Sequence, residues 1–325
     1  MMPPSSTRYS WTLLRAGPLR LDGGSMFGVV PRVIWSRMID ADERGRIEVA
    51  HNCLLLSRID QPQTRVLIET GSGDKLDAKT RDIFGLVPDR SIREAITEAG
   101  VKPDEIRHAI VSHLHFDHAG GLTRRVQPGE VPDWTSPSPE GQAFGVKFTF
   151  PNATIHVQKC EYEDAIANKS VMTRTYLREN LEPLRHAGLR LIESSPPFPP
   201  GQVPSRGEKP RVPLVDRFTE VIPGIFAFLV PGHTWGQHAL LFTDDRGQTV
   251  VFTPDVMPTI HHLGAAYNMA YDVEPYVSTI TRGWFLDEAA RNNWLLVLDH
   301  EPSDPCRRVR PDGKGWYRLV DQATA

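Results

Sequence analysis

The sequence is poor in cysteine. Only Cys53, Cys160 and Cys306 occur in 325 residues, and they are far apart and form no C-x-x-C pair. An odd number of widely spaced cysteines does not make the disulfide framework of a small secreted protein. We therefore expect the three side chains to be buried apolar groups in a protein that resides in a reducing compartment.

The sequence also lacks membrane and targeting segments. Residues 1–10 do not have the charged-then-apolar order of a signal peptide, and no apolar run approaches the ~20 residues that span a bilayer. The net charge is only −3, and no basic stripe accompanies it. These absences predict a cytoplasmic protein that binds neither membrane nor nucleic acid.

The chain is long enough for a large hydrophobic core, and its 40% hydrophobic and 24% charged residues are typical of a soluble globular protein. Apolar patterning and capping signals predict an alternation of strands and helices, which indicates an α/β sandwich of two sheets in one domain. The strands are expected at 9–14, 19–24, 47–59, 64–69, 106–112, 153–158, 218–230, 239–242, 248–253 and 294–298, and the helices at 91–99, 160–167, 175–186 and 274–292.

Three segments interrupt this pattern. Residues 25–35 form an unusually apolar loop, which requires cover from a partner chain, from the rim of a pocket or from its own domain. Prolines break any regular element in 124–146, which we predict to be a loop. Seven prolines in 195–213 predict a second insertion, a long surface segment that could act as a flap.

Ligand-type side chains gather where the strand over 106–112 ends. His113, His115, Asp117 and His118 fall within six positions and precede a Gly-Gly turn. Imidazole and carboxylate are ligands that borderline divalent metals such as Zn²⁺ prefer, and loops on a rigid sheet commonly carry sites. This stretch therefore predicts a metal site.

The same pattern recurs three times later in the chain. His233, Asp255 and His300 each follow an apolar strand. Together with the first cluster they make seven nitrogen and oxygen ligands, more than the three that one catalytic zinc takes from a protein. Seven ligands suit two metals that share a carboxylate, and the absence of thiolates leaves Zn²⁺, Mn²⁺, Fe²⁺ and Co²⁺ open.

This constellation resembles the metallo-β-lactamase superfamily. The carriers are His113-x-His115-x-Asp117-His118, the Gly232-His233-Thr234-x-Gly236 context, Asp255 and His300. The stretches 21–31, 113–123 and 255–259 more narrowly resemble the YtnP-like quorum-quenching lactonases, which are similar to N-acyl homoserine lactonases and methyl parathion hydrolase. The resemblance implies a four-layer αβ/βα sandwich of two mixed sheets with outer helices, formed by 1–325 as a single domain with an N-terminal extension of about residues 1–40.

The resemblance also implies roles for the seven side chains. His113, His115 and His233 would bind one metal, Asp117, His118 and His300 the other, and Asp255 would bridge two ions, with zinc the first expectation. The implied reaction is the hydrolysis of a lactone ring, in which Asp255 holds both metals and Asp117 carries a proton to the leaving alkoxide. Glu69 stands where the superfamily usually has an Asp that orients a ligand histidine.

The substrate pocket is less well defined by the sequence. Met26, Phe27, Trp235 and Met257 flank the motifs and could form an apolar wall, although core packing explains each equally well. His261 could face the pocket, or it could form a surface pair with its neighbour. Pro258 stands where small bacillary lactonases carry a tyrosine, so any phenol that assists the substrate must come from elsewhere.

Two other hydrolytic reactions fit the same ligands. One is hydrolysis of organophosphate triesters or aryl esters, and the other is a thioesterase reaction of the glyoxalase II kind. The glyoxalase II family adds a helical C-terminal domain, whereas this chain is predicted to end in a hairpin over Asp312–Gly315. By family likeness, the partners are a small lactone or ester substrate and a second copy of the chain in a homodimer formed through the apolar N-terminal loop.

Overall fold

The computed structural model describes residues 5–88, 90–136, 145–167, 175–199, 202, 204–205 and 207–322. Contacts between residues divide the chain into two units. The central unit contains Trp11–Leu19 and His51–Leu191, and the C-terminal unit contains Arg20–Ala50 and the chain from Ile192 on, together with the residues before Trp11. Whether the whole chain is the single domain that the sequence predicts stays a prediction.

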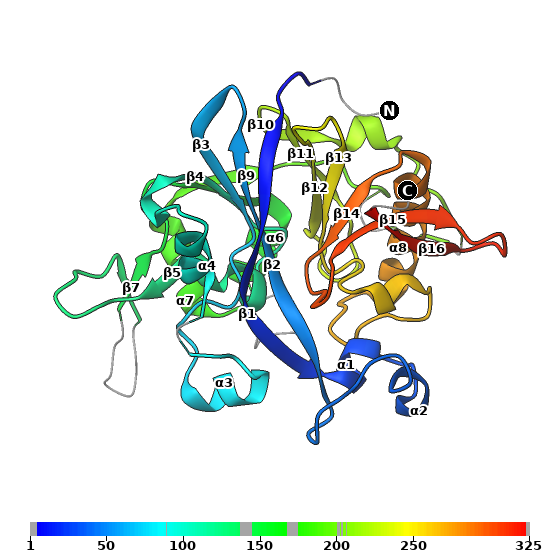
Figure 1. The fold of residues 1–325 in the computed structure, drawn as a ribbon, viewed down its shortest axis with the longest axis horizontal. Helices are drawn as coiled ribbons and strands as arrows, with labels where there is room; N and C mark the ends of the chain where they lie inside the picture. The colour runs from blue at the N-terminus through cyan, green and yellow to red at the C-terminus, as the bar shows by residue number, and fades with distance from the viewer. Residues whose placement is uncertain are drawn as a thin grey trace. The chain divides into compact units, whose positions relative to one another are not determined.

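A six-stranded mixed sheet organises the central unit (Figure 1). Antiparallel pairing joins β2 to β3 as a hairpin, and parallel pairing joins β3 to β4 and β4 to β8. The strand order is β1 (Tyr9–Asp22), β2 (Arg46–Arg58), β3 (Gln61–Ile68), β4 (Ile106–Ile110), β8 (Thr154–Gln158) and β9 (Gly188–Ile192).

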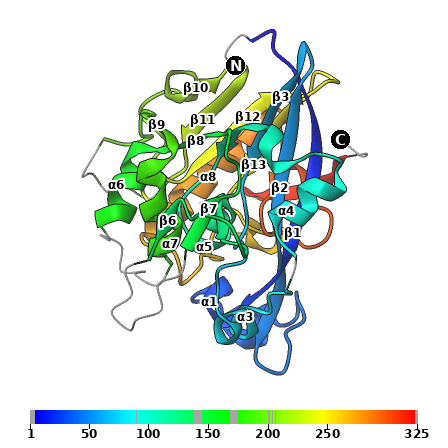
Figure 2. The same cartoon turned by 90° about the vertical axis from the view of Figure 1, so that its left-hand side faces the viewer.

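Helices cover one face of this sheet, and Figure 2 shows α4, α6 and α7 in front of its strands. The first of them, α4, begins at the predicted capping box, because Ser91 and Glu94 satisfy each other's backbone groups. Its apolar side chains pack with those of the strands in one core cluster. The helical elements of this unit are α3 (Ala78–Phe84), α4 (Ile92–Glu98), η1 (Pro103–Glu105), α5 (Phe116–Ala119), η2 (Gly120–Leu122), α6 (Lys159–Ala167), α7 (Arg178–Leu181) and η3 (Glu182–His186).

A seven-stranded mixed sheet organises the C-terminal unit. Neighbouring strands are antiparallel except β13 and β14, which are parallel. The long helix α8 (Pro275–Arg291) lies between them in sequence, and its apolar side chains pack with the sheet in a second core cluster. The strand order is β10 (Thr219–Ile222), β11 (Ile225–Leu229), β12 (His238–Thr243), β13 (Thr249–Thr253), β14 (Leu295–Leu298), β15 (Cys306–Pro311) and β16 (Tyr317–Asp321).

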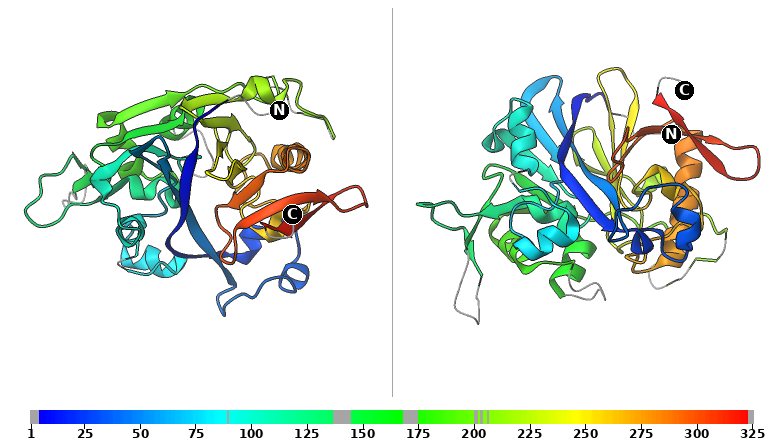
Figure 3. Two further views of the ribbon diagram at one scale, coloured as in Figure 1. Left: turned by 45° about the horizontal axis from the view of Figure 1, so that its top comes forward. Right: turned by 60° about the horizontal axis from the view of Figure 1, so that its bottom comes forward.

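The last two strands form the hairpin predicted over Asp312–Gly315, and Figure 3 shows it in red beside α8 in orange. The unit also contains the short helices α1 (Gly23–Phe27), α2 (Arg32–Trp35), η4 (Leu214–Arg217) and η5 (Ile260–Leu263). No helix among the described residues is both long and apolar enough to cross a bilayer.

Three expectations about local structure are wrong in part. Residues 25–35, predicted as a loop, include the end of α1 and all of α2. Asp22 caps the first turn of α1 by accepting a hydrogen bond from Ser25 N at 2.7 Å. The segment 124–146, predicted as loop, contributes to a small sheet. The helix predicted over 175–186 is divided into α7 and η3, because Pro183 has no N–H to continue an α-helix. The small sheet has the order β5 (Thr123–Arg125), β7 (Gly145–Phe148) and β6 (Trp134–Thr135).

Candidate metal centre

In the central unit, three histidines of the first motif gather beyond the end of β4. The imidazole ring of His113 lies 4.5 Å from that of His115 and 3.9 Å from that of His118, measured between ring centroids. All three side chains are buried. Asp117 is close to them, with Oδ1 3.9 Å from Nε2 of His118. The structure thus brings together the four ligand-type residues of this motif.

Two of these rings are held through their Nδ1 atoms. Nδ1 of His113 hydrogen-bonds to Oγ of Ser112 at 3.0 Å, and Nδ1 of His118 lies 3.4 Å from Oε2 of Glu69. The other carboxylate oxygen of Glu69 accepts a hydrogen bond from the backbone N–H of Ser112 at 2.6 Å. A contact at Nδ1 assigns Nε2 as the candidate metal-binding nitrogen, which is the usual arrangement in histidine sites.

Glu69, which the sequence predicts to orient a ligand histidine, thus contacts the motif through its carboxylate. Its backbone has φ +67°, a left-handed conformation that is unusual outside glycine. Strain of this kind is common at functional sites, where surrounding contacts maintain it. Here the bond to Ser112 supplies such a contact.

A second buried carboxylate, Glu161 on α6, also holds the motif. Oε1 of Glu161 accepts hydrogen bonds from the backbone N–H of Leu114 at 2.9 Å and from the hydroxyl of Tyr176 at 3.0 Å. The Tyr176 ring lies 5.1 Å from that of His115. Sequence reasoning missed both residues, because neither stands in a motif or at a strand end.

In the C-terminal unit, Asp255 lies between two histidines. Its Oδ2 is 3.0 Å from Nε2 of His233, and its Oδ1 is 3.5 Å from Nε2 of His300. Asp299, which sequence reasoning also missed, offers a carboxylate atom within 4.8 Å of ligand atoms of Asp255 and His300. It could have been noticed, because it directly follows the apolar strand β14, one residue before His300.

These histidines are also held through Nδ1. Nδ1 of His233 lies 3.0 Å from Oδ1 of Asp272, and Nδ1 of His300 donates to the carbonyl oxygen of Ala50 at 2.8 Å. Asp272 is buried and follows His233 by 39 residues, so no spacing rule identified it. Both Nε2 atoms consequently face Asp255.

The electrostatics of this group favour a cation. Burial lowers the pKa of His233, but the carboxylates of Asp255 and Asp272 outweigh burial and raise it to about 10. Asp255 and Asp299 are both buried, and buried carboxylates need compensating positive charge. Imidazole nitrogens and carboxylate oxygens are the donors that divalent metals of the zinc and manganese type accept. The residues present therefore fit a divalent metal ion.

The candidate substrate residues lie in different environments. Met26, Phe27 and Met257 are buried, whereas Trp235 is 47% exposed and His261 is partly exposed. The Phe27 ring is packed within its own unit, where Trp35 stacks at 5.5 Å and His262 at 5.1 Å.

The alternative of a surface pair is wrong for His262. Its ring is buried, with Nε2 bonded to the carbonyl oxygen of Met26 at 2.8 Å and Nδ1 bonded to Oγ1 of Thr259 at 2.8 Å. Burial lowers the pKa of His262 to about 3, so this histidine is neutral at physiological pH. It links η5 to α1 as part of the packing around Phe27.

Gly232 sets the backbone conformation directly before His233. It has φ +135°, and a Cβ atom at this position would lie 2.4 Å from the backbone nitrogen of Ser278 on α8. We expect Gly232→Ala to lower the free energy of unfolding by about 3 kcal/mol, because backbone strain and a backbone clash both oppose it. Urea denaturation measures this loss.

Gly313 is the matched control for Gly232. It also has positive φ, at +76°, but a Cβ atom there meets no atom within 4 Å. Gly313→Ala should therefore lose only the strain contribution, about 1 kcal/mol. Equal losses for the two variants would show that the close approach of α8 to Gly232 does not matter.

Comparisons with known proteins agree with this chemistry. A family model described as the metallo-beta-lactamase superfamily matches residues 46–300. An N-acyl homoserine lactonase of Bacillus thuringiensis is 24% identical over 269 residues, which cover 78% of this chain and 83% of that protein.

Solved structures show the same fold. A probable metal-dependent hydrolase from Staphylococcus aureus matches with a TM-score of 0.71 at 25% identity, covering 97% of this chain and 98% of that chain. AidC, a dizinc quorum-quenching lactonase in complex with a product, matches with a TM-score of 0.67 at 16% identity, covering 98% of this chain and 99% of its own. The second likeness is one of fold alone.

Proposed function

Because the chain belongs to the metallo-beta-lactamase superfamily, we propose that it is a hydrolase that opens the lactone ring of N-acyl homoserine lactones with two divalent metal ions. The family match extends from residue 46 to residue 300, so it includes every predicted ligand. The Bacillus thuringiensis relative supports the substrate class, and the buried imidazole and carboxylate groups of the motifs support divalent metal ions.

The observation that carries the proposal is the way the candidate ligands are held. In each unit, histidines of the motifs are anchored through Nδ1 by a carboxylate, a hydroxyl or a carbonyl oxygen. Such anchoring orients Nε2 toward a metal and raises its basicity. The proposed assignment is His113, His115 and His233 for one ion, Asp117, His118 and His300 for the other, and Asp255 for both.

The protein groups have separate tasks in this reaction. When bound, the two ions supply Lewis acidity for the ester carbonyl and make water acidic enough to deprotonate near neutral pH. Asp272 and Glu69 keep two histidines in the required tautomer and orientation. Asp117, whose side chain is 11% exposed, is proposed to carry a proton to the alkoxide that forms when the ring C–O bond breaks.

A substrate panel tests the proposal. Each lactone ring that opens consumes one water and yields a hydroxy acid, which releases one proton at neutral pH. We expect the metal-loaded protein to have a kcat/KM for N-hexanoyl homoserine lactone about tenfold or more above its values for an aliphatic lactone, an aryl ester, an aryl phosphotriester and a glutathione thioester. Proton release in weakly buffered solution gives the rates for the lactones.

The homoserine lactam with the same acyl chain is the matched control, since it keeps the ring and tail but has a poorer leaving group. It should bind without being opened. If kcat/KM is higher for the phosphotriester or the thioester than for N-hexanoyl homoserine lactone, that compound class is the better substrate and the lactone assignment is wrong. If the metal-loaded protein hydrolyses none of the esters, lactones, phosphotriester and thioester of the panel, the proposal is contradicted. The homodimer and the cytoplasmic location stay predictions.

A further inference from the structure

A buried arginine lies outside the candidate metal centre. Arg217, at the end of η4, is 1% exposed. Burial lowers its pKa to about 10, which still leaves the guanidinium charged at neutral pH. Among the residues that the structure describes, none hydrogen-bonds to its Nε or Nη1. A buried charge without such a partner is costly, so an anion that completes its hydrogen bonding would be stabilised here.

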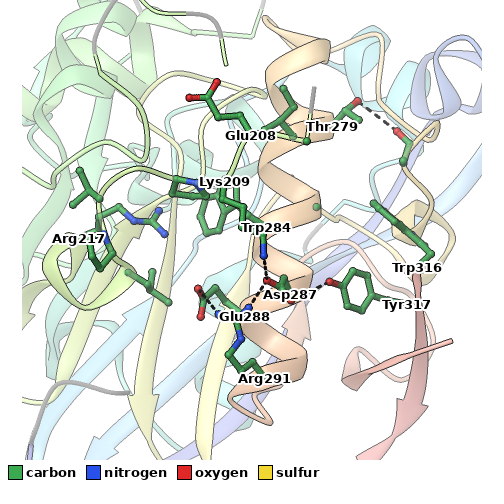
Figure 4. Close-up of a pocket in the computed structure, with 18 of the residues that line it drawn as sticks. Glu208, Lys209, Arg217, Thr279, Trp284, Asp287, Glu288, Arg291, Trp316 and Tyr317 are labelled. Atoms are coloured by element: carbon green, nitrogen blue, oxygen red, sulfur yellow. Dashed lines mark hydrogen bonds and ion pairs between the residues drawn. The ribbon is translucent and has the colours of Figure 1, made fainter. Parts of the chain in front are cut away.

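Arg217 lines a cavity of about 600 Å³ within the C-terminal unit (Figure 4). This volume is typical of small-molecule sites. Arg217 extends toward Trp284 on α8, and its Cζ lies 4.3 Å from the centre of the indole ring. The indole Nε1 of Trp284 is a second buried donor without a hydrogen-bond partner among the described residues. Because guanidinium and indole N–H groups only donate, the missing partner must be an acceptor.

The other charged groups at this cavity largely neutralise one another. Lys209 Nζ lies 3.6 Å from Oδ2 of Asp287, and Arg291 pairs with the same carboxylate at 2.5 Å and with Glu288 at 3.4 Å. Acidic groups at the rim disfavour ligands with several negative charges, such as phosphate esters. With Arg217 as the cation that lacks hydrogen-bond partners at Nε and Nη1, the cavity therefore favours an anion with a single charge.

The remaining walls suit an apolar ligand body. Trp284, Trp316 and Ile280 line the cavity beside Arg217. Gly283 also lines the cavity and lies in the middle of α8, where glycine destabilises a helix by about 1 kcal/mol relative to alanine. A Cβ atom on Gly283 would meet only the Trp316 ring, at 3.9 Å. The missing side chain keeps space open along this wall.

We propose that this cavity is a second ligand site, which binds a small monocarboxylate with an apolar or aromatic body through Arg217. The carboxylate accepts hydrogen bonds from the guanidinium, and the apolar body lies against Trp284 and Trp316. None of the seven proposed metal ligands lines the cavity. The site therefore does not depend on the proposed lactonase activity.

Binding of 1-naphthylacetate to the metal-loaded full-length protein tests this inference, with 1-naphthylacetamide as the uncharged probe of equal shape. Titration calorimetry should show the acid binding about tenfold or more tightly than the amide. Arg217→Met removes the charge while keeping an apolar side chain of similar length, and it should weaken binding of the acid about tenfold to a hundredfold. The same substitution should leave binding of the amide nearly unchanged.

Two variants of Gly283 separate loss of the site from loss of the fold. Gly283→Leu places a side chain in the cavity beside Trp316 and should weaken binding of both probes, whereas Gly283→Ala should raise helix stability and keep most of the binding. Equal affinity of the acid for the parent, Arg217→Met and Gly283→Leu proteins would overturn the proposal. Binding that is lost in Asp255→Ala but kept in Arg217→Met would place the carboxylate at the metal centre instead.

Discussion

Replacement of Asp255 by alanine is expected to lower kcat/KM for hydrolysis about a thousandfold or more and to reduce the metal content from about two ions per chain. One carboxylate oxygen of Asp255 lies 3.0 Å from Nε2 of His233, and the other lies 3.5 Å from Nε2 of His300. A single substitution thus removes the charged group between two candidate ligands. Elemental analysis of the purified variant and steady-state kinetics measure the two effects.

Asp245 provides the matched control for this change. It is an exposed aspartate in the turn between β12 and β13, ten residues before Asp255. Asp245→Ala should keep both metal content and activity. If Asp255→Ala keeps two ions and loses only activity, the carboxylate does not bridge the metals. If it keeps both, Asp255 is not part of the site.

The positions of Asp255 and His300 beyond two strand ends could be predicted because strand ends are local features. Apolar runs identify β13 and β14, and a ligand-type residue follows each run. The parallel register pairs Thr253 with Leu298, so Asp255 and His300 each lie two residues beyond a paired position. The strands and their ends can be predicted from the sequence, and the parallel pairing of β13 with β14 then brings Asp255 and His300 to the same level of the sheet.

Residues that contact the candidate ligands could not be predicted in this way. Asp272 contacts His233 from a turn before α8, and Glu161 contacts Leu114 from α6. Their positions depend on the packing of elements distant in sequence, for which no spacing rule exists. Arg217 escaped notice for a related reason, because its burial and its lack of partners are visible only once η4 and α8 are packed together.

Local structure with many prolines was also mispredicted. The prolines of 124–146 were expected to exclude regular structure, yet Trp134 and Thr135 pair with β7. A proline excludes a backbone donor only at its own position, so short strands fit between prolines.

Asp272→Asn is expected to lower kcat/KM about a hundredfold, although asparagine has nearly the same shape as aspartate. The Asp272 carboxylate can only accept a hydrogen bond, so it keeps a proton of His233 on Nδ1, 3.0 Å away, and leaves Nε2, which faces Asp255, as the nitrogen that would bind a metal. An asparagine amide can donate to Nδ1 instead, which moves the ring proton to Nε2 and prevents that nitrogen from binding a metal. Metal affinity, measured by competition with a chelator, should fall about tenfold to a hundredfold.

The Asp272→Asn variant should still fold. The second carboxylate oxygen of Asp272 accepts a bond from the backbone N–H of Met269 at 3.2 Å, and the amide oxygen of asparagine can replace it there. The melting temperature should therefore change by only a few degrees, as it should for Asp40→Asn, an exposed control. A large loss of stability with unchanged metal affinity would mean that Asp272 serves the fold alone. A loss of metal affinity at nearly constant stability would establish that it positions His233.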